Sequence, residues 1–121
     1  MQYTLSILVE NQAGVLSKIS GLFSRRGFNI DSLAVGVTQD PSVSRITIVA
    51  NGDEYSVEQL EKQLNKLIPV IKVKRLNEGE FISRELVLIK VHCAASKRAE
   101  IVKTVEIMQA KIVDVNYLCV F

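Results

Sequence analysis

The sequence has no tryptophan, one histidine and only two cysteines, and this scarcity removes several kinds of chemistry. Cys93 and Cys119 lie far apart, and together with His92 they do not form the spacing of a metal-ligand set. We therefore expect no bound metal, and two reduced thiols in a reducing compartment.

Catalytic motifs are missing as well. The chain has no P-loop, no G-x-G-x-x-G turn and no H-E-x-x-H helix. His92 and Cys93 are neighbours at the end of a predicted strand, where adjacent side chains point to opposite faces, so they do not form a nucleophilic pair. Carboxylates are scattered over predicted helix surfaces, where their spacing suits solvation or salt pairs. The sequence predicts no catalytic residue.

Neither an excess of one charge nor a long apolar run is present. The 15 basic and 13 acidic residues give a formal net charge of +2. Nucleic-acid binding requires a concentrated cationic face, whereas Arg25-Arg26 and Lys97-Arg98 are short doublets at expected helix ends. No apolar run approaches the ~20 residues needed to cross a bilayer. We expect neither nucleic acid nor a membrane as a partner.

What the sequence does contain is a glycine turn between a predicted strand and a predicted helix. Residues 10–16 read ENQAGVL. Gly14 lets the backbone approach a ligand closely, and the first turn of the following helix offers unpaired N–H groups to a carboxylate. Residues 27–33 read GFNIDSL, and we interpret them as a second strand that brings Asn29 back beside the turn. This arrangement suits a sensor of a small amino acid.

Two interpretations of the turn remain open at this point. Gly14 can simply be a glycine at a helix entry, and Asn29 a turn residue after a helix. Alternatively, Asn11 and Asn29 are carboxamides that both donate and accept hydrogen bonds, as a zwitterion requires. The first loop and the start of the second strand would then meet only across a sheet edge or a dimer. An exposed edge strand invites pairing with a second copy, which would place the sites at the seam between the two copies.

Alternation and helical periodicity place this turn in a small α+β domain. Apolar residues alternate over several segments, as in strands with one buried face, and fall at helical spacing over two others. The order β-α-β-β-α-β within about 75 residues predicts a ferredoxin-like split-βαβ fold, an antiparallel four-stranded sheet with both helices on one face. The predicted strands are residues 3–9, 33–37, 43–50 and 70–76, and the predicted helices are residues 15–26 and 56–68.

The ends of the second helix follow from local signals. Ser56 stands three residues before Gln59, which is the spacing of a capping box, so we expect Ser56 to cap this helix. Pro69 then stops it after Ile68.

The pattern starts again after a linker at residues 77–80. Residues 86–91 predict a strand, Ser96 a helix cap, and Ile112, Val113 and Val115 the opening of another strand. This β-α-β order repeats the first half of the ferredoxin-like domain. The buried stripe of the helix is expected to comprise Ile101, Val102, Val105 and Met108. We predict a complete domain at residues 1–77 and a partial, apparently truncated one at residues 78–121, or one that another chain completes.

A longer set of motifs surrounds the glycine turn and goes well beyond a lone glycine. Together these motifs resemble the small regulatory subunit of acetolactate synthase (acetohydroxyacid synthase), and the match runs from about Tyr3 to near Val115. The resemblance implies an ACT domain followed by an incomplete second ferredoxin-like domain. The motifs are Val9-Glu-Asn11-Gln-Ala-Gly14-Val-Leu16-Ser-Lys-Ile19, Leu22-Phe23, Arg26-Gly27-Phe28-Asn29-Ile30, Ser32-Leu33 and Ser44-Arg45-Ile46-Thr47.

The resemblance implies a non-catalytic subunit of a transferase complex. In that family the small subunit associates with a large catalytic subunit, which uses thiamine diphosphate, magnesium and FAD to condense pyruvate with a second 2-ketoacid. The small subunit raises that activity and confers feedback inhibition by valine in branched-chain amino acid biosynthesis. We therefore expect a homodimer without cofactors of its own, with the large subunit and valine as partners. Since no leader peptide is recognised, we expect it in the bacterial cytoplasm or the plastid stroma.

The resemblance also assigns site residues. Asn11 and Gly14 fall on the family's valine-binding turn, and Asn29 falls on an asparagine that the facing subunit of the dimer contributes. Gly36 lies where the second strand leaves the site. The neighbours expected to line the pocket are Ala13, Val15, Leu16 and Ile30. The alternative function is a stand-alone ACT sensor that serves another enzyme or a transcription factor.

Overall fold

The computed structural model describes residues 1–116 and 119–120 and divides the chain into two units, Met1–Ile82 and Ser83–Phe121. The division lies five residues beyond the predicted boundary after Asn77. Residues 78–82 therefore belong with the first unit.

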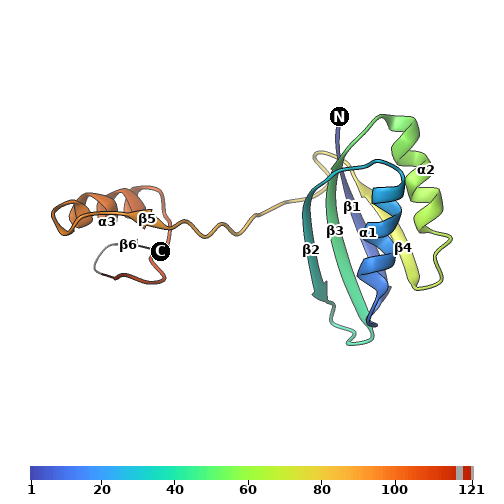
Figure 1. Cartoon of the computed structure of the whole chain (residues 1–121), viewed down its shortest axis with the longest axis horizontal. Helices are drawn as coiled ribbons and strands as arrows, with labels where there is room; N and C mark the ends of the chain where they lie inside the picture. Colours follow the sequence, from blue (N-terminus) through green and yellow to red (C-terminus); the bar gives the residue numbers. More distant parts are fainter. Residues whose placement is uncertain (117–118, 121) are drawn as a thin grey trace. The chain divides into compact units, whose positions relative to one another are not determined.

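The first unit is an antiparallel four-stranded sheet with two helices against one of its faces (Figure 1). The strand order is β2-β3-β1-β4, so β1 and β3 are central and β2 and β4 form the edges. This topology confirms the predicted ferredoxin-like α+β fold. The elements are β1 (Gln2–Glu10), α1 (Val15–Arg25), β2 (Ile30–Val37), β3 (Val43–Asn51), α2 (Glu54–Leu64) and β4 (Val70–Leu76).

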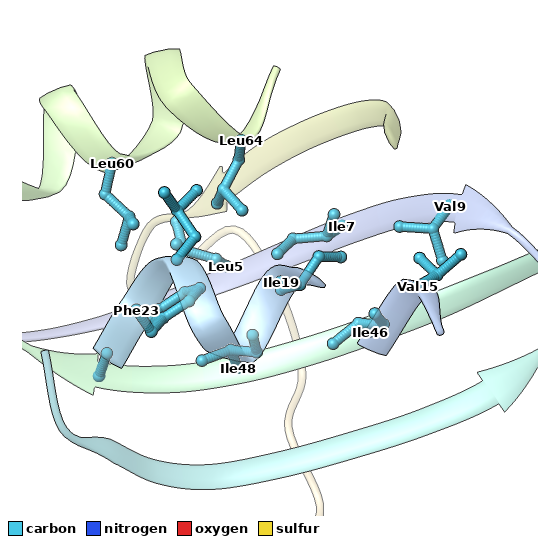
Figure 2. Close-up of a cluster of buried hydrophobic side chains, with 12 residues drawn as sticks. Leu5, Ile7, Val9, Val15, Ile19, Phe23, Ile46, Ile48, Leu60 and Leu64 are labelled. Carbon is cyan, nitrogen blue, oxygen red and sulfur yellow. The ribbon is translucent and has the colours of Figure 1, made fainter. Parts of the chain in front are cut away.

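The core lies between the sheet and the two helices. Figure 2 shows its side chains converging from the central strands and from α1 and α2, and β2 contributes none of the labelled ones. Leu5, Ile7 and Val9 alternate on β1 as predicted and are buried. Phe23 is completely buried and meets Phe28 edge-to-face, with the ring centroids 6.2 Å apart. Burying each large apolar side chain stabilises the fold by about 1.5–3 kcal/mol.

The second helix differs from the prediction at both ends. Asp53, not Ser56, is its N-cap: the Asp53 carboxylate accepts hydrogen bonds from the Ser56 N–H (2.9 Å) and hydroxyl (2.6 Å). The helix ends at Leu64 rather than Ile68, whose side chain is 93 % exposed. The last turn is not continued because a residue before proline disfavours the helical conformation, and residues 65–70 close successive tight turns instead.

Two register shifts interrupt the sheet. One lies between Ile30 and Ser32 where β2 pairs with β3, and the other lies between Leu8 and Val9 where β1 pairs with β4. The shift in β2 leaves Asp31 as the extra residue of a bulge. β2 also begins earlier than predicted, at Ile30 instead of Leu33.

The second unit has less regular structure than the sequence predicted. It contains β5 (Val91–His92), the short helix η1 (Ala95–Lys97), α3 (Arg98–Ile107) and β6 (Cys119–Val120), with β5 antiparallel to β6.

Four predictions for this unit are wrong. Residues 86–90 form no strand and their side chains are exposed, because in the described residues the only ladder in this unit is the two-residue pairing of β5 with β6. Ser96 lies inside η1 and does not cap a helix. No strand opens at residues 112–114. The predicted buried stripe of the helix is also absent, because α3 buries none of its residues and Met108, just beyond its end, is exposed. A strand or an amphipathic helix is stable only where another element covers its apolar side.

Candidate functional site at the glycine turn

Gly14 adopts a backbone conformation that favours glycine. Its φ of +85° and ψ of −10° are left-handed, and it is the N-cap residue of α1. A Cβ at this position would meet no atom within 4 Å, so the cost of a larger residue is backbone strain rather than a clash. The glycine therefore leaves open space in front of the first turn of α1.

The first turn of α1 is uncapped, in contrast to that of α2. No side chain caps α1, its first turn contains no acidic residue, and its first internal hydrogen bond runs from the Lys18 N–H to the Gly14 carbonyl. The corresponding end of α2 has both the Asp53 cap and the acidic Glu54. The positive end of the α1 dipole is thus available to an anion, whereas that of α2 is already neutralised.

Asn11 is held against the turn between β2 and β3. Its N–H donates to the Ser42 carbonyl (2.8 Å) and its side-chain amide donates to the Pro41 carbonyl (2.9 Å). The turn is itself ordered by Asp40, which accepts from the Ser42 N–H and hydroxyl, and these hydrogen bonds lower the pKa of the Asp40 carboxyl. The side-chain carbonyl of Asn11 accepts no hydrogen bond from the described residues.

A small hollow of about 70 Å³ lies beside this loop. The structure brings together three of the predicted site residues here, Asn11, Val15 and Leu16, while Gly14 and Ala13 lie in the chain between them. It also adds inward-facing strand residues that the sequence analysis did not assign. The register pairs Val35 with Ile46 and Val9 with Ser44. The alternation of the predicted strands already placed these residues on the face that the helices cover, so they could have been assigned to the site from the sequence. The lining comprises Val9, Glu10, Asn11, Gln12, Val15, Leu16, Val35, Ser44 and Ile46.

Asn29 and Ile30 do not lie beside the turn within one chain, which corrects the first interpretation of this strand. Ile30 pairs with Ala50, and Ala50 pairs with Tyr3, whereas the glycine turn follows Glu10 at the other end of β1. The seven residue steps from Tyr3 to Glu10 span about 23 Å of strand. The Asn29 side chain instead donates to Asp31 (2.9 Å), and Ile30 packs against the core.

β2 is an edge strand with an uncovered apolar side. Leu33, Val35 and Val37 share the face of the sheet that α1 and α2 cover elsewhere, yet they are 42 %, 50 % and 60 % exposed. The strand has eight residues without lysine or proline. The other edge, β4, has Lys72 and Lys74, which are typical of edges protected from pairing.

A group of charged side chains lies away from the glycine turn, where β4 and the start of β1 meet α2. Arg75 of β4 forms ion pairs with Glu61 (2.6 Å) and Glu54 of α2, and its guanidinium lies 5.1 Å from the centroid of the Tyr3 ring. The Tyr3 hydroxyl donates to Glu54 (2.9 Å). Hydrogen bonds from Arg75 and Tyr3 lower the pKa of Glu54, and burial followed by the Glu54 contact raises that of Tyr3. This group joins β1, β4 and α2.

Neither a metal cluster nor a membrane-spanning helix is found in the described residues. Within residues 1–116 and 119–120, no cluster of three or more His, Cys, Asp or Glu side chains could hold a metal ion. The helices in those residues are too short and too polar to cross a membrane. Cys93 is a free, buried thiol, while the prediction for the Cys119 thiol lies outside the described side chains.

Both units match family models. Residues 5–72 match the AHAS small subunit-like ACT domain, and residues 84–120 match the small subunit of acetolactate synthase. The acetolactate synthase small subunit of Mycobacterium avium is 52 % identical over 94 % of this chain and 68 % of that protein. A probable acetolactate synthase small subunit of Archaeoglobus fulgidus is 53 % identical over 96 % of this chain and 72 % of that protein.

Solved structures agree with these matches. The crystal structure of the acetolactate synthase small subunit from Thermotoga maritima superposes with a TM-score of 0.82 at 35 % identity, covering 99 % of this chain and 75 % of that one. The ACT domain of a Chlorobium tepidum GTP pyrophosphokinase superposes with a TM-score of 0.55 over 63 % of this chain and 97 % of that one, and at 19 % identity it shows the fold alone.

Proposed function

This chain belongs to the acetolactate synthase small-subunit family, and we propose that it acts there as a homodimer that binds valine and regulates the large catalytic subunit. Bound valine inhibits the large subunit, and the chain without valine raises its activity. The observation that carries this proposal is the uncapped start of α1 at Gly14, beside Asn11 and an apolar hollow.

The amino acid's carboxylate is accommodated by the first turn of α1. Its N–H groups lack both a side-chain cap and a nearby acidic residue, so an anionic group satisfies them and meets the positive end of the helix dipole. Gly14 permits close approach because no side chain stands in front of these N–H groups.

The rest of the effector has complementary surroundings. The side-chain carbonyl of Asn11 is an acceptor for the ammonium group, and Val15, Val35 and Ile46 form an apolar wall for the isopropyl group. An apolar pocket separates side chains that differ by one methylene by only ~1–3 kcal/mol. We therefore expect leucine and isoleucine to bind as well, more weakly or more tightly according to the fit.

A second copy completes the site in this proposal. Two β2 edges pair antiparallel about a two-fold axis, which makes one continuous sheet and covers the exposed Leu33, Val35 and Val37. Because β2 runs from Asn29 toward the hairpin turn that holds Asn11, antiparallel pairing moves Asn29 of the partner subunit to the Asn11 end of the strand. Each effector site then includes residues from both subunits.

Regulation follows from linkage. Valine changes the activity of the large subunit only if it binds one arrangement of the dimer more tightly than another and the large subunit distinguishes the two. In this proposal the reaction and its cofactors, thiamine diphosphate, magnesium and FAD, belong to the large subunit, and this chain contributes neither a cofactor nor a catalytic residue.

Calorimetric titration with valine tests the effector site. We expect heat for the wild type and none for Gly14→Asp, because the added carboxylate occupies the anion's place and repels it. Gly79→Asp is the matched control: Gly79 also has a positive φ, +84°, and open space around it, but it lies away from the turn. Equal loss of binding in both variants, or no heat from the wild type at millimolar valine, would contradict the proposal.

An activity assay tests the partner. Acetolactate formation by the large subunit is measured with and without this chain, and with and without valine. We expect stimulation that valine reverses, and a Gly14→Asp variant that stimulates but resists valine. A chain that neither co-purifies with the large subunit nor changes its rate would favour a stand-alone amino-acid sensor.

A further inference from the structure

Among the described residues, Arg45 has no partner for its charge; it lies on the face of the sheet opposite α1 and α2, here called the helix-free face. It pairs in register with Gly36 of β2. Its strand neighbours Ser44 and Ile46 are buried on the helix side, so the Arg45 side chain lies on the helix-free face. No hydrogen bond or ion pair in the described residues involves its guanidinium, although Glu10 lies two register positions away on β1.

Asp31 lies on the same face at the opposite end of β2. It is the extra residue of the bulge, and its carboxylate accepts hydrogen bonds from the side chains of Gln2 (3.5 Å) and Asn51. Gln2 and Asn51 pair across β1 and β3 next to the inward-facing Tyr3, which places them on the helix-free face. Every donor to Asp31 in the described residues is a neutral amide, so its charge has no cationic partner there.

A two-fold axis through the middle of β2 brings Arg45 of one subunit near Asp31 of the partner subunit. Antiparallel pairing of two β2 edges brings the start of one strand to the end of the other and keeps the same faces together. Residues on like faces must lie opposite one another, which an axis at Leu33 or Ala34 satisfies. Asp31 of the partner subunit then lies opposite Val35 or Val37, next to Gly36, and the bulge places its carboxylate on the face that carries Arg45.

Space for this contact is present in the isolated chain. An open hollow of about 390 Å³ lies over β2 and β3, and its lining includes Ala34, Gly36, Arg45 and Thr47. A Cβ at Gly36 would meet nothing within 4 Å. From β3 to the β2 strand of a second copy is two strand spacings, about 10 Å. A long arginine side chain has room to cross β2 here, because Gly36 presents no side chain and Ala34 only a methyl group.

We propose that Arg45 of each subunit forms an ion pair with Asp31 of the partner subunit across Gly36, and that the two symmetric pairs set the register in which the β2 edges join. The inference rests on the homodimer proposed above and specifies how it assembles. The bulge turns the Asp31 carboxylate to the helix-free face. The same register places Asn29 of the partner subunit at the effector hollow. A dimer in this register therefore has both the two ion pairs and two complete effector sites.

Charge reversal tests the pair. The dimer dissociation constant is measured by sedimentation equilibrium at low ionic strength for the wild type, Arg45→Asp, Asp31→Arg and the double variant. Each single reversal places two like-charge contacts in the dimer, and we expect dissociation constants raised about tenfold. The double variant restores opposite charges, and we expect a constant within about threefold of the wild type. High salt should reduce these differences.

Lys74→Asp is the matched control, because Lys74 is an exposed cation on the helix-free face of the opposite edge. We expect its dimer to be unchanged. A double variant as weak as the product of the two single effects would overturn the ion pair while leaving the homodimer in place. A wild type that stays monomeric at high concentration would overturn both the ion pair and the homodimer, and valine titration of that monomer would then show whether effector binding survives.

Discussion

The side-chain amide of Asn11 donates a 2.9 Å hydrogen bond to the backbone carbonyl of Pro41. This contact joins the loop that precedes α1 to the turn that connects β2 with β3. Together with the backbone bond from Asn11 to Ser42, it holds the glycine turn against the end of the edge strand. In the proposed dimer, these two hydrogen bonds connect the pairing of β2 with the hollow beside Asn11.

Removing the Asn11 side chain separates this role from general stability. We expect Asn11→Ala to lower the free energy of unfolding by about 0.5–1.5 kcal/mol, the net value of one hydrogen bond, and to weaken valine binding. Asn65→Ala is the control, because Asn65 makes an equivalent exposed bond to the Glu61 carbonyl (3.1 Å). Urea unfolding and calorimetry give both quantities. Unchanged valine affinity in Asn11→Ala would remove Asn11 from the site.

Two glycines of the same region should respond oppositely to alanine. Gly14→Ala forces a Cβ into a left-handed conformation and should destabilise the fold by about 1–2 kcal/mol. Gly21 lies inside α1 with open space around it, so Gly21→Ala should stabilise by about 0.5–1 kcal/mol. Urea unfolding of the two variants measures the contrast. Equal effects would mean that backbone conformation does not set the requirement at Gly14.

The two sheet edges should differ in their tolerance of charge. Val35→Lys places two unpaired ammonium groups per dimer in the proposed seam, and we expect the dissociation constant to rise roughly 100-fold, equivalent to about 2.8 kcal/mol. Ile71→Lys on β4 is the control, since the two side chains are similarly exposed. Sedimentation equilibrium compares them. If Ile71→Lys weakens the dimer instead, the subunits pair through the β4 edge.

Acid should weaken the N-cap of α2. The Ser56 hydroxyl and N–H hold the pKa of the Asp53 carboxyl below its ordinary value of 3.8. The pKa of Asp53 is lower in the folded protein than in the unfolded chain. The ionised carboxylate therefore stabilises the fold above about pH 4, and this stabilisation is lost as the pH falls through the folded-state pKa. Asp53→Asn keeps an acceptor at the cap but does not titrate. Urea unfolding at successive pH values should show a smaller acid loss for this variant.

The acid dependence has its own internal check. Ser56→Ala removes the hydroxyl that contributes most to lowering the Asp53 pKa. Its acid loss should lie between those of the wild type and Asp53→Asn. An acid loss in Asp53→Asn equal to that of the wild type would assign the pH dependence to other carboxylates.

Local patterns were enough to predict much of the first unit. The alternation of Leu5, Ile7 and Val9 identified β1 and its buried face, and β4 begins and ends where its apolar pattern does. Gly14 was predicted to be the glycine of a turn, and its left-handed conformation is the physical reason for glycine at this position. These features depend on neighbours within a few residues, which any reader of the sequence can see.

Features that depend on distant partners were not visible in the same way. The cap of α2 is a local exception: Ser56 had a capping spacing, yet Asp53, three residues earlier, takes the position. Residues 86–90 have a strand pattern, but no partner in the described residues pairs with them. Asn29 was expected beside the turn, whereas the sheet register places it at the far end of β2. Sequence periodicity specifies which side of an element is apolar, but pairing and register depend on long-range contacts, and those exist only once the chain has folded.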